Sequence, residues 1–295
     1  MDVGGSAVKL GMVSADGSRR EERAIAVEPG RSAEQIFAHV AEVLAPLAAG
    51  PLGGVGVGLP GLLDREAGCV RHSPNLPWLE DAPVRDLLSE PLGLAPERVL
   101  LENDANVAAL GEQWLGAARG MRHLLLLTLG TGIGGGLIFD GRLFIGEGLA
   151  GEVGHITVDP DGLHCGCGSR GCLETLASAT AARRRAVERG LPREAPGDLE
   201  LLTTRGRASA GPERELLEAV GYDLGRGLAD VVDLLDVRTF VFGGGFSAAL
   251  DVLEPGIRRA LGDWSYGERL AGVQLIRATL GGSAGWIGAA RLLLG

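Results

Sequence analysis

The chain has 295 residues, of which 49 are glycine, and its formal net charge at pH 7 is −10. This length predicts two domains, or one large domain divided by a cleft. The acidic balance argues against the basic surface with which nucleic-acid binders attract phosphates, so we expect no nucleic-acid partner. Apolar runs are too short to cross a membrane, and the first residues lack a secretory signal pattern. We therefore expect a cytoplasmic protein without membrane contact.

Lys9 is the single lysine among 28 basic residues. P-loops and protein kinases both depend on a lysine inside a fixed motif. The residues around Lys9 match neither motif, so any phosphate bound by this chain is held without those lysines.

The first 50 residues have the pattern of a β-hairpin followed by a helix. Apolar alternation over 2–14, resumed over 23–27, predicts two paired strands. Ser32 with Gln35 three residues later has the form of a capping box. Apolar residues then recur at helical spacing, which predicts a helix over 33–49.

Two short apolar strands follow, at 55–59 and 99–101, and each ends in a turn. The first strand leads into Gly61 and the second into Asn103 and Asp104. Ligands of open α/β sheets bind at such carboxyl ends of strands, so both turns are candidate binding positions.

A second strand, glycine turn and strand series begins near residue 123. An apolar strand over 123–128 leads into a glycine run over 130–136, and an apolar return follows over 137–139. This order repeats that of the first hairpin, about 125 residues earlier. The repetition predicts a duplicated fold with one hairpin in each lobe.

The remaining part of the chain is predicted to be mainly helical. The pattern predicts helices, one surface loop and one buried strand that ends in Gly243 and Gly244. In chain order these are a helix over 173–187, a surface loop over 190–212, a helix over 212–234, the strand over 239–242, and a last helix over 283–294.

The two glycine turns are candidate phosphate sites, because backbone N–H groups of glycine approach an anion closely. A hydroxyl residue in each turn adds a donor, and a carboxylate beside the first turn would orient a metal ion that bridges nucleotide phosphates. The alternative is that these glycines only form tight turns. The residues concerned are Asp2, Gly4, Gly5 and Ser6 in the first turn, and Gly130, Thr131, Gly132 and Gly134 in the second.

Asp104 stands between a predicted strand and a helix predicted over 105–115. A carboxylate in a cleft can take the proton of a hydroxyl that attacks a phosphoryl group, and the neighbouring amide of Asn103 would hold substrate hydroxyls. The alternative is that Asp104 is only the N-cap of the helix.

Three cysteines and one histidine have the spacing of a metal site: Cys165, Cys167, Cys172 and His155. A Cys3His set is a closed tetrahedral zinc site, so the metal would be structural and would fix the surrounding loop. His164 is the competing fourth ligand, and three free buried cysteines are the alternative without metal. Two glutamates, Glu152 and Glu174, flank the cluster and would accept hydrogen bonds from sugar hydroxyls. Taken alone, each glutamate is more often part of a solvated surface.

Six motifs together resemble the ROK family of repressors, open reading frames and sugar kinases, and they extend in family order over nearly the whole chain. They are Asp2-x-Gly4-Gly5-Ser6, Gly58-Leu59-Pro60-Gly61 with Asp64, Glu102-Asn103-Asp104-Ala105-Asn106, the run from Gly130 to Gly136, Gly151-Glu152-Val153-Gly154-His155, and the segment from Cys165 to Glu174.

The resemblance implies an α/β fold of the actin-like ATPase (ribonuclease H-like) type, with two lobes around a cleft where ATP and a hexose meet. The smaller lobe would comprise 1–107 plus 281–295, and the larger lobe 108–280 with the zinc loop. Asp104 would deprotonate the sugar 6-hydroxyl, and His155 would contact both sugar and zinc. Further hexose contacts would come from Gly61, Asn103, Glu152 and Glu174, Mg-ATP phosphates would lie on the two glycine turns, and Gly243 and Gly244 would lie against the adenosine.

The resemblance therefore predicts an ATP-dependent hexose kinase, in the first place a glucokinase, that transfers the γ-phosphoryl group to the 6-hydroxyl and forms a homodimer or homotetramer. The same motifs are typical of N-acetylmannosamine kinases and of kinases of fructose, mannose or allose, which stay open. An alternative of another class is a sugar-responsive transcriptional repressor. Such repressors have a helix-turn-helix region before the first phosphate motif, and we expect none here.

Overall fold

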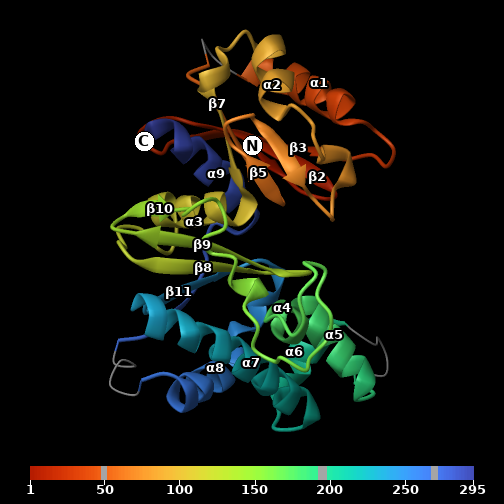
Figure 1. Cartoon of the computed structure of the whole chain (residues 1–295), viewed down its shortest axis with the longest axis vertical. Helices are drawn as coiled ribbons and strands as arrows, with labels where there is room; N and C mark the ends of the chain where they lie inside the picture. Colours follow the sequence, from red (N-terminus) through yellow and green to blue (C-terminus); the bar gives the residue numbers. More distant parts are fainter. Residues whose placement is uncertain (48–51, 192–197, 267–271) are drawn as a thin grey trace. The chain divides into compact units, whose positions relative to one another are not determined.

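The computed structural model describes residues 1–47, 52–191, 198–266 and 272–295 (Figure 1). The chain divides into two compact units. Unit 1 comprises residues 1–121, 136–150 and 280–295, and unit 2 comprises residues 122–135 and 151–279.

The first five-stranded sheet has the order β3-β2-β1-β4-β7 and belongs to unit 1. The strands β1, β4 and β7 are parallel, whereas β2 is antiparallel to both of its neighbours. Their bounds are β1 Asp2–Val3, β2 Ala7–Val13, β3 Arg19–Ala26, β4 Val55–Leu59 and β7 Val99–Asn103. A small antiparallel hairpin, β5 Leu62–Asp64 with β6 Cys69–His72, follows β4.

The second five-stranded sheet has the order β10-β9-β8-β11-β12. Its strands are β8 Leu124–Leu129, β9 Ile133–Phe139, β10 Arg142–Phe144, β11 Thr239–Gly243 and β12 Gln274–Arg277. β11 is parallel to both β8 and β12, and β10 is antiparallel to β9. The strand order thus matches that of the first sheet position by position, which supports the predicted duplication. The second hairpin is not confined to one unit, because residues 136–150 belong to unit 1.

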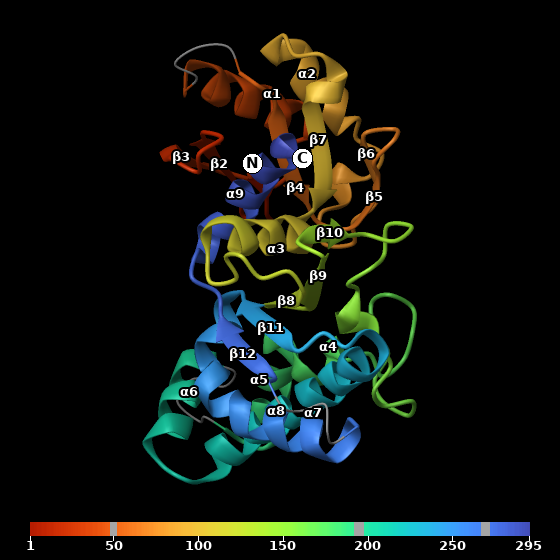
Figure 2. The ribbon, with the colours of Figure 1, turned by 90° about the vertical axis from the view of Figure 1, so that its left-hand side faces the viewer.

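Four α-helices of the described chain belong to unit 1: α1 Ala33–Leu44, α2 Val84–Leu92, α3 Asp104–Leu115 and α9 Ala284–Arg291. The helices α4 Glu174–Ala177, α5 Ala179–Glu188, α6 Leu199–Ala208, α7 Pro212–Leu235 and α8 Leu250–Trp264 belong to unit 2. α7 and α8 lie side by side in both views (Figures 1 and 2). In the described part of the chain, no helix combines the length and the apolar character that a membrane span requires.

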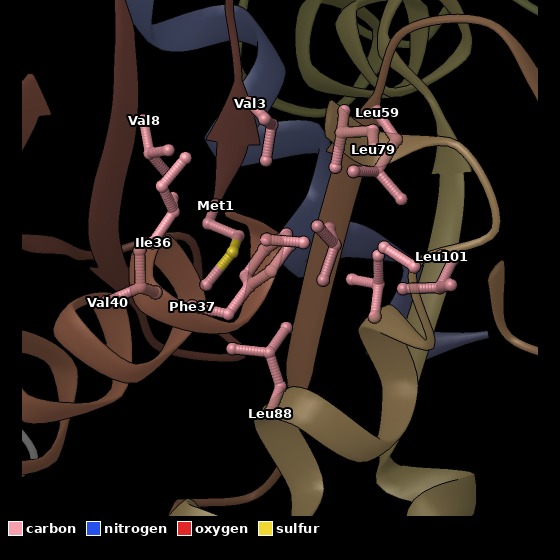
Figure 3. Packing of buried hydrophobic residues seen from close by; sticks show 14 of the residues in the cluster. Met1, Val3, Val8, Ile36, Phe37, Val40, Leu59, Leu79, Leu88 and Leu101 are labelled. Carbon is pink, nitrogen blue, oxygen red and sulfur yellow. The ribbon is translucent and has the colours of Figure 1, made fainter. Parts of the chain in front are cut away.

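The core of unit 1 lies between the sheet and the helices α1 and α2. Figure 3 shows Phe37 of α1 beside Met1 and Leu59 of β4 beside Leu79, with Leu88 of α2 and Leu101 of β7 in the same cluster of buried side chains. Phe37, Leu59 and Leu88 are fully buried. This burial supplies most of the favourable free energy that holds the strands in place, and it fixes the ends of β4 and β7 from which the candidate residues project.

Several predicted elements are confirmed, with changed ends. Ser32 and Gln35 form the predicted capping box, and α1 ends at Leu44 before a 3-10 turn over Ala45–Leu47; the last two residues of the predicted helix lie outside the described residues. The predicted helix over 173–187 is interrupted at Ser178, whose side chain accepts a hydrogen bond from the Ala181 N–H and so begins a new helix.

The surface loop predicted over 190–212 is wrong in its second half, because α6 occupies Leu199–Ala208. The Asp198 carboxylate caps this helix by accepting hydrogen bonds from the N–H groups of Glu200 and Leu201. Leu202 is fully buried, and Gly206 lies so close to Leu217 of α7 that a Cβ there would be 2.8 Å from it. Packing against α7 therefore stabilises a segment whose glycine and threonines favour helix only weakly.

Candidate functional site

In unit 1, two candidate turns lie at the same edge of the sheet. β4 and β7 are parallel neighbours, with Leu59 paired to Asn103, so the turns that follow them lie at adjacent strand ends. Gly61 has a φ of +98°, and a Cβ at this position would clash with the carbonyl oxygen of His72. Only glycine fits this turn.

The turn after β7 presents Asp104 at the start of α3. Asn103, not Asp104, is the N-cap of α3: its Oδ1 accepts from the N–H groups of Ala105 at 2.9 Å and Asn106 at 3.3 Å. The Asp104 carboxylate accepts a hydrogen bond from the same Ala105 N–H at 2.8 Å and is exposed. The alternative that Asp104 is only a cap is therefore wrong, because Asn103 fills that position.

Asp2 occupies the central strand of unit 1, between Lys9 on β2 and Gly58 on β4. Burial raises the pKa of its carboxyl group, an effect opposed by the N-terminal ammonium and by Lys9. Gly285 in the first turn of α9 approaches so closely that a Cβ there would clash with the carboxylate. A desolvated carboxylate of this kind gains from a nearby cation, which fits the prediction that Asp2 orients a metal ion.

The residues after Asp2 form an open turn. The Gly4 N–H donates to the Ala7 carbonyl at 3.0 Å, and the turn between β1 and β2 exposes Gly5 and Ser6. Backbone N–H groups and a hydroxyl are therefore accessible to a phosphate here.

In unit 2, the second glycine turn is held from two directions. The Gly134 N–H donates to the hydroxyl of Thr128 at 3.2 Å, and the Ile133 N–H donates to Oε2 of Glu174 at 3.3 Å. Gly132 lies directly against that carboxylate, where a Cβ would clash, while Thr131 at the tip is exposed.

A third glycine turn lies beside the second one. β11 pairs in parallel with β8, so that Gly243 is opposite Thr128. Gly244 has a φ of +78°, and a Cβ there would clash with the Leu129 carbonyl. The structure thus brings Gly243 and Gly244 next to the Gly130 turn at adjacent strand ends.

The predicted metal ligands converge within unit 2. One ligand atom of each of the four residues, His155, Cys165, Cys167 and Cys172, lies within 4.8 Å of all the others. His155 Nδ1 is 3.6 Å from Cys165 Sγ, and Cys167 Sγ is 3.6 Å from Cys172 Sγ. Zn–S bonds of about 2.3 Å in a tetrahedron put ligand atoms about 3.8 Å apart, so the spacing suits zinc.

His164, the competing ligand, is engaged elsewhere: its Nε2 lies 2.7 Å from Nη2 of Arg170. The N–H of Ser169 lowers the pKa of Cys167 to about 7, which favours the thiolate that a metal requires. Burial raises the pKa of the other two thiols, Cys165 and Cys172. The four residues fit a closed zinc site in composition and spacing.

One ring nitrogen of His155 lies toward a cysteine of the candidate metal site, and the other lies toward a carboxylate. Its Nδ1 lies toward Cys165 and its Nε2 is 3.9 Å from Glu152 Oε2. Burial raises the pKa of Glu152, opposed by the nearby His155. The three predicted sugar-binding side chains of unit 2, Glu152, His155 and Glu174, thus lie together.

Glu174 has a connecting role that the sequence did not indicate. Besides holding the glycine turn through Oε2, it accepts a hydrogen bond from Cys165 Sγ at 3.0 Å through Oε1. One carboxylate therefore contacts both a candidate phosphate turn and the metal cluster. The signal available in the sequence was its position two residues after Cys172, where it is now the first residue of α4.

A cavity of ≈ 370 Å³ in unit 1 lies away from these residues. Side chains that line it include Met12 of β2, Trp114 of α3 and Leu293 near the C-terminus. Its lining contains none of the predicted site residues, so it is not part of the predicted site.

Comparison with known proteins agrees with this geometry. A glucokinase of Thermotoga maritima is 36% identical over an alignment of 310 positions, which covers 99% of this chain and 96% of that protein. The structure of a ROK family glucokinase from Streptomyces griseus in complex with glucose and AMPPNP matches with a TM-score of 0.81 at 34% identity, over 99% of this chain and 97% of that one. A ROK family transcriptional regulator, a homologue of the E. coli MLC protein, matches with a TM-score of 0.87 at 25% identity, over 100% of this chain and 76% of that one.

These structural neighbours and the duplicated α/β topology define the class: the chain has the actin-like ATPase fold with two lobes. The ROK family model matches residues 1–295, and the chain belongs to the ROK family.

Proposed function

We propose that this protein is an ATP-dependent hexose kinase, a glucokinase, that transfers the γ-phosphoryl group of ATP to the sugar 6-hydroxyl. Identity to a glucokinase over nearly the full length of both chains supports the proposal. The observation that carries it is the turn after β7, where Asn103 caps α3 and leaves the Asp104 carboxylate exposed at a strand end.

Asp104 is the proposed general base. Its carboxylate takes the proton of the 6-hydroxyl as that oxygen attacks the γ-phosphorus, so that the nucleophile forms no unstable oxonium. The hydrogen bond from the Ala105 N–H fixes the orientation of the carboxylate. Because phosphoryl transfer depends mainly on positioning, a base with a fixed orientation accelerates the reaction more than a mobile one.

The remaining hydroxyls of the hexose are the proposed ligands of a mixed set of side chains. In unit 2, His155 lies between two glutamates: its Nε2 is 3.9 Å from Glu152 Oε2, and its Nδ1 is 3.9 Å from Glu174 Oε1. Carboxylates accept hydrogen bonds from sugar hydroxyls, and the imidazole donates or accepts. In unit 1, the amide of Asn103 and the Gly61 turn complete the proposed set.

Mg-ATP is the proposed phosphoryl donor. The two exposed glycine turns, with Ser6 and Thr131, would bind its phosphates through N–H and hydroxyl groups, and Asp2 would hold Mg²⁺. Magnesium held there would neutralise charge on the transferring phosphoryl group. The turn of Gly243 and Gly244 is the proposed adenosine contact.

Zinc is the proposed occupant of the cluster of one histidine and three cysteines, and its role is structural. Four protein ligands leave no open coordination position, so the metal does not activate water. His155 would hold the metal through Nδ1, which lies toward Cys165, and this bond would fix the ring with Nε2 facing the carboxylate of Glu152.

A panel assay tests the choice of sugar. Purified protein with Mg-ATP is supplied in turn with glucose, mannose, fructose, allose and N-acetylmannosamine, and ADP release is coupled to NADH oxidation. We expect the highest kcat/KM with glucose. A higher value with N-acetylmannosamine would identify the other kinase of the same class, and no release with any sugar would contradict the proposal.

A sugar-responsive regulator is the second candidate, and the match to the transcriptional regulator structure favours it. The identity of 36% to the glucokinase, against 25% to the regulator, supports the kinase instead. A gel-shift assay with DNA upstream of the gene separates the two, and we expect no shift.

Because a kinase of this kind uses cytosolic ATP, the proposal places the protein in the cytoplasm. The homodimer or homotetramer stays a prediction.

A further inference from the structure

An ion pair between the buried Glu102 and the half-buried Arg65 lies next to the proposed base. Glu102 is the residue before Asn103 on β7 and is only 5% exposed. Arg65, which follows β5, donates to Oε2 of Glu102 from Nε at 2.9 Å and to Oε1 from Nη2. This two-bond fork is the strong and directional form of an arginine–carboxylate contact.

The same carboxylate also holds the turn that presents Asp104. Oε1 of Glu102 accepts the backbone N–H of Asn103 at 2.8 Å and the side-chain amide of Asn106 at 2.9 Å. One oxygen is therefore bound to the residue before Asp104 and to the residue two positions after it. The backbone on both sides of the proposed base is tied to a single group.

Arg65 is itself fixed from two sides. Its carbonyl oxygen accepts Nη2 of Arg85 at 2.6 Å, and Arg85 also donates to the Glu66 carbonyl at 2.7 Å. On the other side Nη1 of Arg65 lies against Gly148, where a Cβ would be 3.2 Å from it. The guanidinium therefore has little freedom to follow a displaced Glu102.

Stability alone explains this arrangement poorly. Removing two charges from water costs about as much free energy as their attraction returns, so a buried pair is weak evidence of a stabilising role. Here the donors to Glu102 come from two separate segments, the residue after β5 and the turn between β7 and α3. We propose that Glu102 and Arg65 are positioning residues that aim Asp104 and Asn103 at the sugar, an inference that rests on the proposed kinase function.

The inference predicts a specific kinetic signature for Glu102→Gln. The amide keeps the shape of the side chain, but it replaces one acceptor oxygen by an N–H donor opposite groups that are donors themselves. The turn then loses one anchor, and a displacement of about 1 Å at a reacting group costs on the order of 100-fold in rate. We expect kcat to fall about 10- to 100-fold, glucose KM to rise, and ATP KM to stay within about twofold.

Variants at Arg65 probe the other half of the pair. Arg65→Gln should show the same signature as Glu102→Gln. Arg65→Lys keeps the charge without the fork, so it should recover part of the lost rate. The matched control is Arg207→Gln, which breaks another two-bond pair, Arg207 with Asp251 on the surface of unit 2, and should leave both KM values and kcat unchanged.

The experiment measures kcat and both KM values for wild type and the four variants, together with thermal unfolding and zinc content. The expected result is a loss of kcat with a raised glucose KM, an unchanged ATP KM and bound zinc in Glu102→Gln and Arg65→Gln, with partial rescue in Arg65→Lys. If Glu102→Gln does not fold, Arg65→Lys decides by the same criteria.

Two results would contradict the inference in different ways. A wild type without hexose kinase activity would overturn the proposed function and, with it, this inference. An active wild type whose Arg65→Gln and Glu102→Gln variants keep kcat and glucose KM within about twofold would overturn the positioning role alone, whatever happens to their melting temperatures.

Discussion

The turn after β7 in unit 1 and the cysteine loop in unit 2 place their candidate side chains by different means. In unit 1, a strand end, a helix N-cap and an ion pair fix Asn103 and Asp104. In unit 2, the segment from His155 to Cys172 has only isolated bridges, such as Thr157 with Cys172, and its side chains converge on a metal cluster. Hydrogen bonds of regular structure thus position the proposed base, whereas bonds to the proposed zinc would position His155 among the proposed sugar contacts.

The largest effect is expected in unit 1, at the base itself. Asp104→Asn keeps the size of the side chain and removes its basicity, so kcat should fall about 10²- to 10⁴-fold while the calorimetric Kd for glucose changes little. Asp86→Asn, at another acidic residue in the first turn of a unit 1 helix, is the control and should keep full activity. Activity of Asp104→Asn above a few per cent of wild type would refute the assignment.

Metal loss should affect unit 2 and spare unit 1. Cys167→Ala, or treatment with a chelator, should release zinc and raise glucose KM on the order of 10-fold, because His155 loses its fixed orientation. Cys69→Ala changes a buried cysteine of unit 1 outside the cluster and should leave glucose KM unchanged. Metal analysis that finds no zinc in the wild type would remove this part of the account.

A smaller effect is expected at the turn after β4. Gly61→Ala combines a φ of +98° with a clash against the His72 carbonyl, so it should lower the free energy of unfolding by about 2–3 kcal/mol. Gly120→Ala has a φ of +79° and open space around the new Cβ, and it should cost about 1 kcal/mol. Urea denaturation compares them; equal losses would show that the close approach at Gly61 is unimportant.

The smallest effect on stability is expected at the cap of α3. Asn103→Ala removes the acceptor for two N–H groups and should cost about 1 kcal/mol, or about 2–4 °C in melting temperature. Asn103→Ser keeps a good cap and should melt like wild type, although without the amide its glucose KM should rise. A melting temperature of Asn103→Ser as low as that of Asn103→Ala would contradict the capping geometry.

Local patterns in the sequence were sufficient for part of this account. The spacing of Cys165, Cys167 and Cys172 predicts a metal site. Three cysteines so close together in the sequence cannot lie far apart in the fold. Similarly, apolar strands that run into Gly61 and Asn103 predict candidate binding turns at two strand ends, since ligands of open α/β sheets bind at the carboxyl ends of strands. These predictions need only local order and the rules of sheet topology.

Other features depend on long-range packing and leave no local pattern. Arg65 and Glu102 are 37 residues apart, and no periodicity links them. The choice between Asn103 and Asp104 as N-cap depends on where β7 ends, since both residue types cap helices well. The helix α6 depends on contact with α7, which the polar composition of its segment conceals.

The most direct test of the kinase identifies the product. Purified protein is incubated with glucose and Mg-ATP, and the reaction is followed by ³¹P NMR. The account predicts the appearance of glucose 6-phosphate and ADP in equal amounts, at a rate that depends on glucose. ATP that stays intact in the presence of glucose, or a phosphoryl group on another hydroxyl, would contradict it.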